Sequence, residues 1–332
     1  MPKFTIGGRT ANQHRGKDFA AYMDQFDNVT QMRAAAALPR ETQTVIDNAV
    51  VRVGRDRLVV ASDLLQEGLV YNLSNWLSVP SLYRESVGDT SNAQLTMVPK
   101  ARGERHVGDR EGFFLPIPCE WSDFSFDIRS LRASQRAGAD LDTTSTEAAT
   151  RAVNELIEDI VLNGIPYNIN GHTINGLLDT TSTQTFIDGE SWTAAGHSGD
   201  DILRDVQNMV EVARQTKFYG PFNLYIPPAY QGKLNEDFKA NGDKTILQRL
   251  QELEYGGRKL NIRVADRMPN DTVSLLQMSR DVIDLVVGQL PTTVSWTSGP
   301  GWETFFVVLA CVIPRFFPNI DGYFGAVTGK LT

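Results

Sequence analysis

The sequence is poor in the side chains that metal and catalytic sites most often use. Its 332 residues include two cysteines and four histidines. Cys119 and Cys311 are far apart in the chain and both sit among apolar residues, so we expect two buried, reduced thiols and neither a disulfide framework nor a zinc site. No histidine is spaced with another histidine or with a cysteine as metal ligands are. The sequence therefore predicts no metal site.

Long apolar runs are also missing. An apolar run at residues 305–313 ends at Pro314, and it is far shorter than the roughly 20 residues that cross a bilayer as a helix. Residues 2–19 lack the apolar region of a signal peptide. We expect no membrane partner, and a chain that is made in the cytoplasm.

Catalytic and cofactor-binding motifs fail in their context. Residues 196–199 contain Gly-His-Ser-Gly, but they lie in a polar stretch without the strand and helix that flank a catalytic serine. His197 is expected to be an exposed loop residue. Residues 325–331 are similar to a phosphate-binding loop, but a spacer is missing and Leu331 replaces the hydroxyl residue that binds magnesium. We expect no catalytic residue, no cofactor and no enzymatic activity.

Two weaker patterns have structural explanations. Three carboxylates could chelate a cation, but acidic residues in a first helical turn are favoured by the helix dipole, and we prefer that interpretation for Asp200, Asp201 and Asp205. Four aromatics near basic residues could stack on bases, but their alternation fits a half-buried strand better. They are Phe114, Trp121, Phe124 and Phe126.

Basic side chains are concentrated near the start of the chain. Residues 1–40 hold six basic and three acidic side chains, which gives a net charge of +3. Since the whole chain has a net charge of −8, the other 292 residues have a net charge of −11. An acidic body is a poor electrostatic match for nucleic acid. The basic segment has too little apolar surface to order itself, so we expect an interaction tail that neighbouring chains hold.

The segment from residue 143 to residue 164 organises the rest of the chain. Thr144 and Glu147 have the spacing of a capping box, and Gly164 is a natural helix stop. A helix here carries an apolar stripe formed by Ala149, Ala152, Val153, Leu156, Ile157, Ile160 and Val161. Its opposite face holds Glu147, Arg151, Glu155, Glu158 and Asp159. We expect a spine about 27 Å long.

Upstream of the spine, the sequence predicts an adaptor and a long charged loop. Short strands are expected at residues 45–53 and 58–61, followed by a helical segment with one apolar face over residues 64–77. Residues 79–121 are rich in charge and glycine, with alternating runs at 93–98 and 113–117 that form the arms of a β-hairpin. Two interpretations remain open, because so long a loop is uncommon in a compact monomer. It is a disordered insertion, or an arm ordered by another subunit.

Downstream, the pattern predicts strands, a lobe and returning strands. A strand at 122–130 leads into the spine, a tight β excursion surrounds residues 170–176, and 182–198 form a polar loop. A helix capped by Ser198 or Asp200 begins an α/β lobe with strands at 222–228, 260–265, 272–278 and 282–287 and short helices at 229–238 and 244–253. Strands at 292–296 and 303–313 return to the spine, and residues 315–332 hold aromatic anchors followed by a short polar tail.

This order of elements resembles that of the tailed-bacteriophage major capsid (coat) proteins, whose fold is shared with the encapsulin shell proteins of bacteria. The segments that carry the resemblance are 155–164 (ELIEDIVLNG), 174–178 (INGLL), 220–230 (GPFNLYIPPAY) and 284–289 (DLVVGQ). The resemblance covers residues 120–317. Upstream, the chain lacks the amino-terminal helix of encapsulins and the motif before their long loop, and residues 38–77 are more similar to phage coat proteins.

The resemblance implies an α+β protein of the tailed-phage capsid fold (Hong Kong-type), with an N-terminal arm, an extended β-hairpin loop, a long spine helix with a peripheral sheet, and an α/β axial lobe. The expected divisions are an arm and adaptor at 1–78, the extended loop at 79–121, and a peripheral domain at 122–198 with its spine helix at 144–163. An axial domain at 199–288 and return strands with a C-terminal tail at 289–332 complete the chain.

The function that the resemblance implies is that of a structural major capsid protein of the virion. Such a protein self-assembles into hexamers and pentamers of an icosahedral shell around double-stranded DNA, which it contacts weakly and non-specifically. A portal and a decoration protein are further partners of such shells. About 50 residues precede the body, too few for a built-in scaffold, so we predict a separate scaffolding protein or none. The alternative is an encapsulin-like nanocompartment that encloses cargo enzymes.

Subunit contacts are expected at charged residues of the arm, the loop and the spine. These are Arg9, Arg15, Lys17, Lys100, Arg102, Glu104, Arg105, Arg110, Glu111, Glu147, Arg151 and Glu155.

Overall fold

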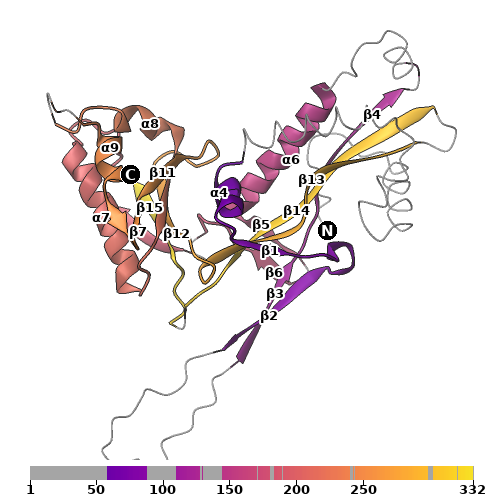
Figure 1. The fold of residues 1–332 in the computed structure, drawn as a ribbon, viewed down its shortest axis with the longest axis horizontal. Coiled ribbons are helices and arrows are strands. Elements are labelled where there is room, and N and C mark those ends of the chain that lie inside the picture. Colours follow the sequence, from indigo (N-terminus) through magenta and orange to yellow (C-terminus); the bar gives the residue numbers. More distant parts are fainter. Residues whose placement is uncertain are drawn as a thin grey trace, which may run out of the picture.

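A computed structural model of the chain describes residues 58–87, 110–127, 129, 144–169, 171–179, 183–188, 190–239, 242, 244–297, 302–319 and 321–331. They form two lobes and a hairpin that projects from one of them (Figure 1). One lobe is built on a four-stranded sheet and the other on a five-stranded sheet. Residues 1–57, with most of the predicted arm, and residues 88–109, with the strand predicted at 93–98, lie outside the described residues.

The four-stranded sheet lies in the lobe that contains the long helix. Its order is β1-β13-β14-β4, and its strands are β1 (Val70–Asn72), β13 (Ile283–Thr297), β14 (Glu303–Phe316) and β4 (Glu120–Asp127). β1 runs parallel to β13, and the other neighbours are antiparallel. The apolar run at residues 305–313 is the buried middle of β14. Because both faces of β14 are covered, its sequence is continuously apolar and does not alternate.

The spine helix, α6 (Thr144–Asn163), has the predicted bounds. It packs on β14 and β4 (Figure 1), and its 20 residues give a length of about 30 Å. The helix ends where Gly164 adopts a φ of 69°, in the left-handed region that favours glycine.

The buried face of α6 is partly polar, contrary to the sequence prediction. The pattern placed Glu158 on the solvent face and Ala152 in the apolar stripe, but Glu158 is 1% exposed and Ala152 is exposed. Thr146, Thr150 and Asn154 are buried as well. Since α4, β4 and β14 contact the helix from more than one side, the buried arc is wider than one apolar stripe.

The segment before β1 is a shorter helix than predicted. α4 (Val60–Gln66) replaces the strand predicted at residues 58–61, and it ends before Gly68, whose φ is 71°. A separate 3-10 turn, η1 (Trp76–Ser78), buries Trp76 and leaves Leu77 exposed. The single helical face predicted over residues 64–77 is therefore wrong, because β1 interrupts it to pair with β13.

The five-stranded sheet forms the other lobe. Its order is β11-β8-β12-β15-β7, with β11 (Asn261–Val264), β8 (Phe222–Ile226), β12 (Thr272–Gln277), β15 (Ala326–Leu331) and β7 (Gln184–Asp188). The lobe also contains α7 (Gly199–Gln215), α8 (Pro228–Leu234), α9 (Ile246–Gln251) and the small hairpin of β9 (Glu254–Tyr255) and β10 (Arg258–Lys259). α7 begins at the predicted cap, since Ser198 and Asp201 form a capping box.

Three strand predictions are corrected by the pairing. The strand predicted at 282–287 for the α/β lobe is the first part of β13 in the other sheet, and β13 continues through two register shifts to Thr297. The loop predicted at 182–198 contains β7, and the polar tail predicted after the aromatic anchors contains β15, which pairs with β12 and β7. These strands are completed by partners far away in the sequence, which local patterns do not reveal.

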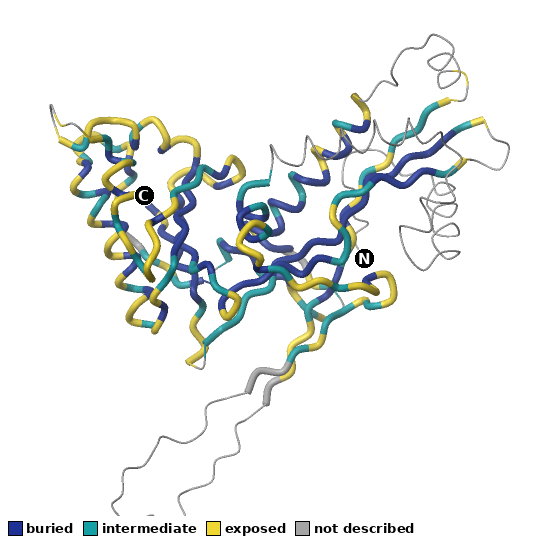
Figure 2. The backbone as a smooth tube through the Cα atoms, viewed as in Figure 1, coloured by how far each residue is buried: buried dark blue, intermediate teal, exposed yellow. Residues whose placement is uncertain are grey.

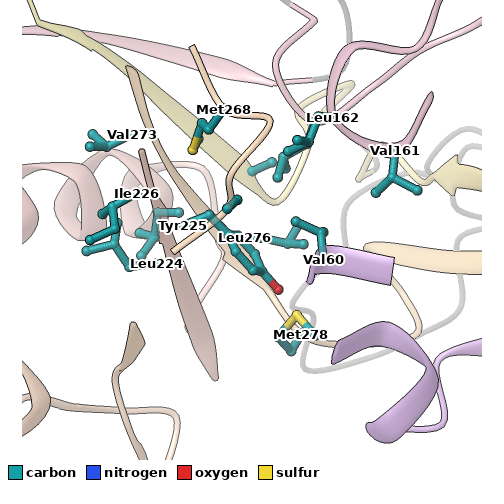
Figure 3. Close-up of a cluster of buried hydrophobic side chains, with 14 of the residues drawn as sticks. Val60, Val161, Leu162, Leu224, Tyr225, Ile226, Met268, Val273, Leu276 and Met278 are labelled. Atoms are coloured by element: carbon teal, nitrogen blue, oxygen red, sulfur yellow. The ribbon is translucent and has the colours of Figure 1, made fainter. Parts of the chain in front are cut away.

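One apolar core continues from lobe to lobe. Figure 2 shows buried backbone along β13, β14 and the sheet of the other lobe, with exposed residues on the outer surfaces. At the junction, Val60 of α4 and Leu162 of α6 lie close to Tyr225 and Leu276 of the five-stranded sheet (Figure 3). The two lobes are therefore packed together through α4 and the end of α6.

Two glycines let the chain turn back closely at the end of α6. After Gly164, β5 (Ile165–Ile169) and β6 (His172–Ile174) form the predicted β excursion. A Cβ atom on Gly176 would lie 2.2 Å from the backbone N of Gly164 and 2.5 Å from the carbonyl O of Leu162. Backbone atoms cannot move aside as a flexible side chain can, so this contact requires glycine.

We expect Gly176→Ala to lower the free energy of unfolding by about 2–3 kcal/mol, because it overpacks the backbone at the end of α6. Gly232→Ala is the matched control, because α8 leaves open space around Gly232 and alanine favours helix by up to about 1 kcal/mol. Thermal and urea unfolding of the two variants measure the difference. Equal stability of the two variants would contradict the close approach.

Candidate assembly interface

The projecting hairpin consists of β2 (Ser81–Val87) and β3 (Arg110–Pro116). The two strands pair antiparallel from Ser81↔Pro116 to Val87↔Arg110, and they extend away from both lobes (Figure 1). The prediction of a hairpin strand at 113–117 is thus confirmed, although the strand begins earlier, at Arg110. Its partner in the described part of the chain is 81–87, which the sequence analysis did not predict as a strand.

Aromatic side chains on this hairpin are open to solvent. Tyr83, Phe113 and Phe114 are 53%, 47% and 45% exposed. The Tyr83 and Phe114 rings lie 5.0 Å apart, and Phe114 lies 5.1 Å from the ring of His172 on β6. A two-stranded hairpin is marginally stable alone in water, and here its exposed rings add apolar surface that a further chain can cover.

The root of the hairpin is fixed by a stack of guanidinium groups and rings. Arg84 lies over the ring of Phe317 at 4.2 Å, and Arg315 lies 4.9 Å from the same ring and 4.6 Å from that of Tyr71. The Arg84 Nη1 also donates to the carbonyl O of Phe316 over 3.4 Å. Burial, and then the neighbouring Arg315, lower the pKa of Arg84. The carboxylate of the buried Asp284 accepts two hydrogen bonds from Arg315 and so compensates the positive charge of that guanidinium group.

A groove of about 410 Å³ lies between the root of the hairpin, β6 and the end of β14. Phe114 and Leu82 supply its apolar wall, and Arg84, His172 and Arg315 supply polar groups. The groove is therefore part of the surface by which the hairpin root meets the four-stranded lobe.

The spine supplies the other described residues that the sequence predicted for subunit contacts. Glu147 is half-buried and Arg151 is exposed on α6. Glu155 is engaged within its own chain, where its Oε2 lies 3.8 Å from Nη1 of Arg267. Arg267 also donates to Asp159, with 2.8 Å from Nε to Oδ1, and this contact raises the pKa of the guanidinium. Arg267, which the sequence analysis missed, ties the outer face of α6 to the other lobe.

The remaining predicted contact residues cannot be placed. Nothing is described of the side chains of Arg110 and Glu111, which lie at the start of β3. The others lie outside the described residues; these are Arg9, Arg15, Lys17, Lys100, Arg102, Glu104 and Arg105.

A buried carboxylate holds α4 against the spine. Glu158 accepts a hydrogen bond from the backbone N–H of Val60 over 2.8 Å, and another from Ala61 over 3.3 Å. No side chain of the segment itself caps α4, so the spine supplies the acceptor that the first turn needs. Burial raises the pKa of Glu158 to about 7, although the two N–H donors favour the ionised form.

The other side of α4 bonds to the five-stranded lobe. Oδ2 of Asp63 accepts from the hydroxyl of Tyr225 over 3.2 Å, and Oδ1 lies 3.2 Å from Nη2 of Arg263. Burial raises the pKa of Asp63 and that of Tyr225. Three elements distant in sequence therefore meet through hydrogen-bonded polar groups inside an apolar junction.

The structure corrects one prediction about the rejected catalytic motif. His197 is not an exposed loop residue, because its side chain is 10% exposed and its Nε2 lies 3.3 Å from Oδ2 of Asp205. The same carboxylate accepts a hydrogen bond from Nε1 of the buried Trp192 over 3.0 Å. The hydroxyl of Ser198 is directed to Asp201 in the helix cap, so this hydroxyl is not aligned with the histidine.

Two further observations concern the part of the chain that the structure describes. Its histidine, cysteine and carboxylate side chains form no group that could hold a metal ion. None of its helices has the length and apolar character needed to cross a bilayer.

Removing the Arg84 stack should loosen the root of the hairpin. We expect Arg84→Ala to speed hydrogen exchange at the β2 amides about 5- to 30-fold, since it removes about 1–2 kcal/mol of cation–π and hydrogen-bond stabilisation. Mass-spectrometric exchange of the unassembled chain measures this. Arg204→Ala, an exposed position on α7, is the control, and unchanged β2 protection in Arg84→Ala would contradict the anchor.

The Glu158 contact should make stability depend on pH. The folded chain holds a proton on Glu158 that the unfolded chain releases between its ordinary pKa of 4.5 and about 7. The free energy of unfolding therefore falls as pH rises through this window, by about 3 kcal/mol. We expect Glu158→Gln to flatten this part of the pH profile, because a side-chain amide does not titrate in this range.

Thermal unfolding of the original chain and the variant at pH 5, 6, 7 and 8 measures this effect. Glu211→Gln, at an exposed position on α7, is the matched control and should leave the slope unchanged. A Glu158→Gln profile as steep as that of the original chain would show that Glu158 carries no such proton.

The fold is similar to those of solved shell structures. The virus-like particle from Pyrococcus furiosus has a TM-score of 0.60 at 19% identity, covering 87% of this chain and 98% of that chain. The capsid of Myoviridae phage XM1 has a TM-score of 0.59 at 11% identity, covering 81% and 91%. The capsid of a native GTA particle has a TM-score of 0.57 at 12% identity, covering 83% and 91%. The predicted tailed-phage capsid fold is thereby confirmed.

Sequence comparisons identify a family but no function. No curated protein sequence matches the chain. A family of unknown function, DUF6260, matches residues 33–297. This match spans most of the sequence, so the chain is a member of the family of unknown function DUF6260.

Proposed function

We propose that this chain is the structural subunit of a protein shell, which assembles from many copies into hexamers and pentamers of an icosahedral capsid. The single observation that carries the proposal is the shared fold, which extends over 81–87% of the chain in three shell proteins. We propose that the role of the chain is structural and not enzymatic.

The projecting hairpin supports the proposal independently of the comparisons. It exposes Tyr83, Phe113 and Phe114 on two strands that project from the body (Figure 1). Contacts between identical chains bury such rings repeatedly, and many weak contacts give a strong assembly. The charged residues predicted on the arm, the loop and the spine remain our proposal for the rims of these contacts.

We further propose that the shell encloses double-stranded DNA in a virion whose subunits are made in the host cytoplasm. The net charge of −8 favours weak, non-specific contact, since a chain with an excess of acidic side chains does not attract phosphate strongly. A portal and a decoration protein belong to the same proposal, together with a separate scaffolding protein or none.

A second candidate is a nanocompartment that encloses cargo enzymes. It is favoured by the likeness to the virus-like particle from Pyrococcus furiosus, 98% of whose chain is covered. The contents of particles from the natural source discriminate between the two candidates. Nuclease-protected double-stranded DNA supports the capsid, and a co-purified enzyme supports the nanocompartment.

Assembly itself can be tested with the recombinant chain. We expect it to elute in the void volume of a gel-filtration column and to form closed particles in negative-stain micrographs. Monomers or small oligomers at high concentration, with no particles, would contradict assembly of the chain without a scaffolding protein.

Shortening the extended loop should separate folding from assembly. Val87 and Arg110 are the last register pair of the hairpin, so an Asn-Gly turn in place of residues 88–109 can close it. We expect this variant to keep the circular dichroism spectrum and melting temperature of the body but to form no shells. Normal shells from this variant would contradict a role of the loop between subunits.

A further inference from the structure

The two cysteines, which are distant in the sequence, come together at the edge of the β14–β4 pairing: Cys311 lies in β14, and Cys119 directly precedes β4. The antiparallel pairing of β14 with β4 runs from Glu303↔Asp127 to Ala310↔Glu120. Extending this register by one residue beyond the start of β4 places Cys119 opposite Cys311. Directly opposite residues of an antiparallel pair have Cα atoms about 4.5–5.5 Å apart and side chains on one face, a separation within the range of about 4.4–6.8 Å that a disulfide spans.

Both cysteines are free thiols, and their side chains influence each other. The interaction between the two side chains lowers the pKa of Cys119 and raises that of Cys311. The expectation of two buried thiols is therefore half right. Cys311 is fully buried beside Trp76 and Leu309, whereas Cys119 is exposed.

The two thiols have different chemical roles because of this asymmetry. The interaction with the Cys311 side chain lowers the pKa of Cys119, so its thiolate is the more accessible nucleophile. That same interaction, together with burial and the neighbouring carboxyl of Glu120, raises the pKa of Cys311. Glu120 is itself buried, and its Oε2 accepts from the backbone N–H of Val312 over 3.2 Å.

We propose that Cys119 and Cys311 form a reversible modification site, which closes to an intrachain disulfide on reaction with a low-molecular-weight disulfide such as oxidised glutathione. The Cys119 thiolate attacks one sulfur of the small disulfide, which forms a mixed disulfide and releases one small thiolate. The Cys311 sulfur then attacks the Cys119 sulfur and releases the second small thiolate, which takes up the Cys311 proton. The two cysteines are oxidised, and one small disulfide is reduced to two thiols.

The bond would fasten the root of the projecting hairpin to the central strand. Cys119 follows β3 by three residues, and the intervening Ile117 donates its N–H to the carbonyl O of Pro80 before β2 over 3.0 Å. A link to Cys311 therefore ties the end of the hairpin covalently to β14. This inference does not depend on shell assembly, since every group in it belongs to one chain.

Intact-mass and peptide analysis of the full chain tests the proposal. The reduced chain is incubated with oxidised glutathione at pH 8, and remaining thiols are then alkylated. We expect loss of two hydrogen atoms, no alkylation, and a peptide linking Cys119 to Cys311. Two alkylated thiols, a glutathione adduct that persists on the original chain, or disulfide-linked dimers on a non-reducing gel would each overturn it.

Two variants assign the roles. Cys311→Ala should stop at a glutathione adduct on Cys119, whereas Cys119→Ser should not react, because Cys311 is buried. The reverse pattern would overturn the assignment of Cys119 as the entry thiol. If Cys311→Ala does not fold, the linked peptide of the original chain still decides the proposal. The oxidised chain should also melt about 5 °C higher than the reduced chain, and dithiothreitol should reverse the shift.

Discussion

The burial of β14 on both faces and its pairing on both edges is the constraint on which the rest of the structure depends. β13 and β4 take up its backbone hydrogen-bonding groups, while α6 covers one face. Its other face packs with Trp76 and Ile117, which flank the hairpin. The end of the strand continues into Phe316 and Phe317, which hold Arg84. One strand thereby positions the spine, the hairpin and the crossing to the second lobe.

The junction between the lobes combines apolar packing with a few directional contacts. The burial of apolar side chains supplies most of the stabilisation, but because it is non-directional it does not fix the position of one lobe relative to the other. Hydrogen bonds to Glu158 and Asp63 do fix that position, because a buried carboxyl group that is displaced from its partners costs much free energy. Tyr225 and Arg263 on one side, and the α4 amides on the other, therefore set how the lobes meet.

Local patterns predicted the elements that local physics determines. The spine has the predicted bounds, and α7 has its predicted capping box, because caps and periodicity are encoded within a few residues. The errors concern long-range contacts. The spacing of Glu158 is that of a solvent-face residue, and only the contact with α4 buries it. β7 is short and polar, and only its pairing with β15 makes it a strand. The proximity of Cys119 and Cys311 depends on the register between two strands that are distant in sequence. The groups that bind the hairpin root could not be predicted for the same reason.

The place of β15 in its sheet affects the order in which this chain can be completed during synthesis. β15 lies between β12 and β7, so a nascent chain that has emerged only as far as β14 has β12 as an open edge and β7 without its strand partner. The five-stranded lobe then cannot reach its final shape, whatever the state of the four-stranded one. Completion of the five-stranded sheet therefore waits for β15, whereas every strand of the four-stranded sheet precedes β15 in the chain.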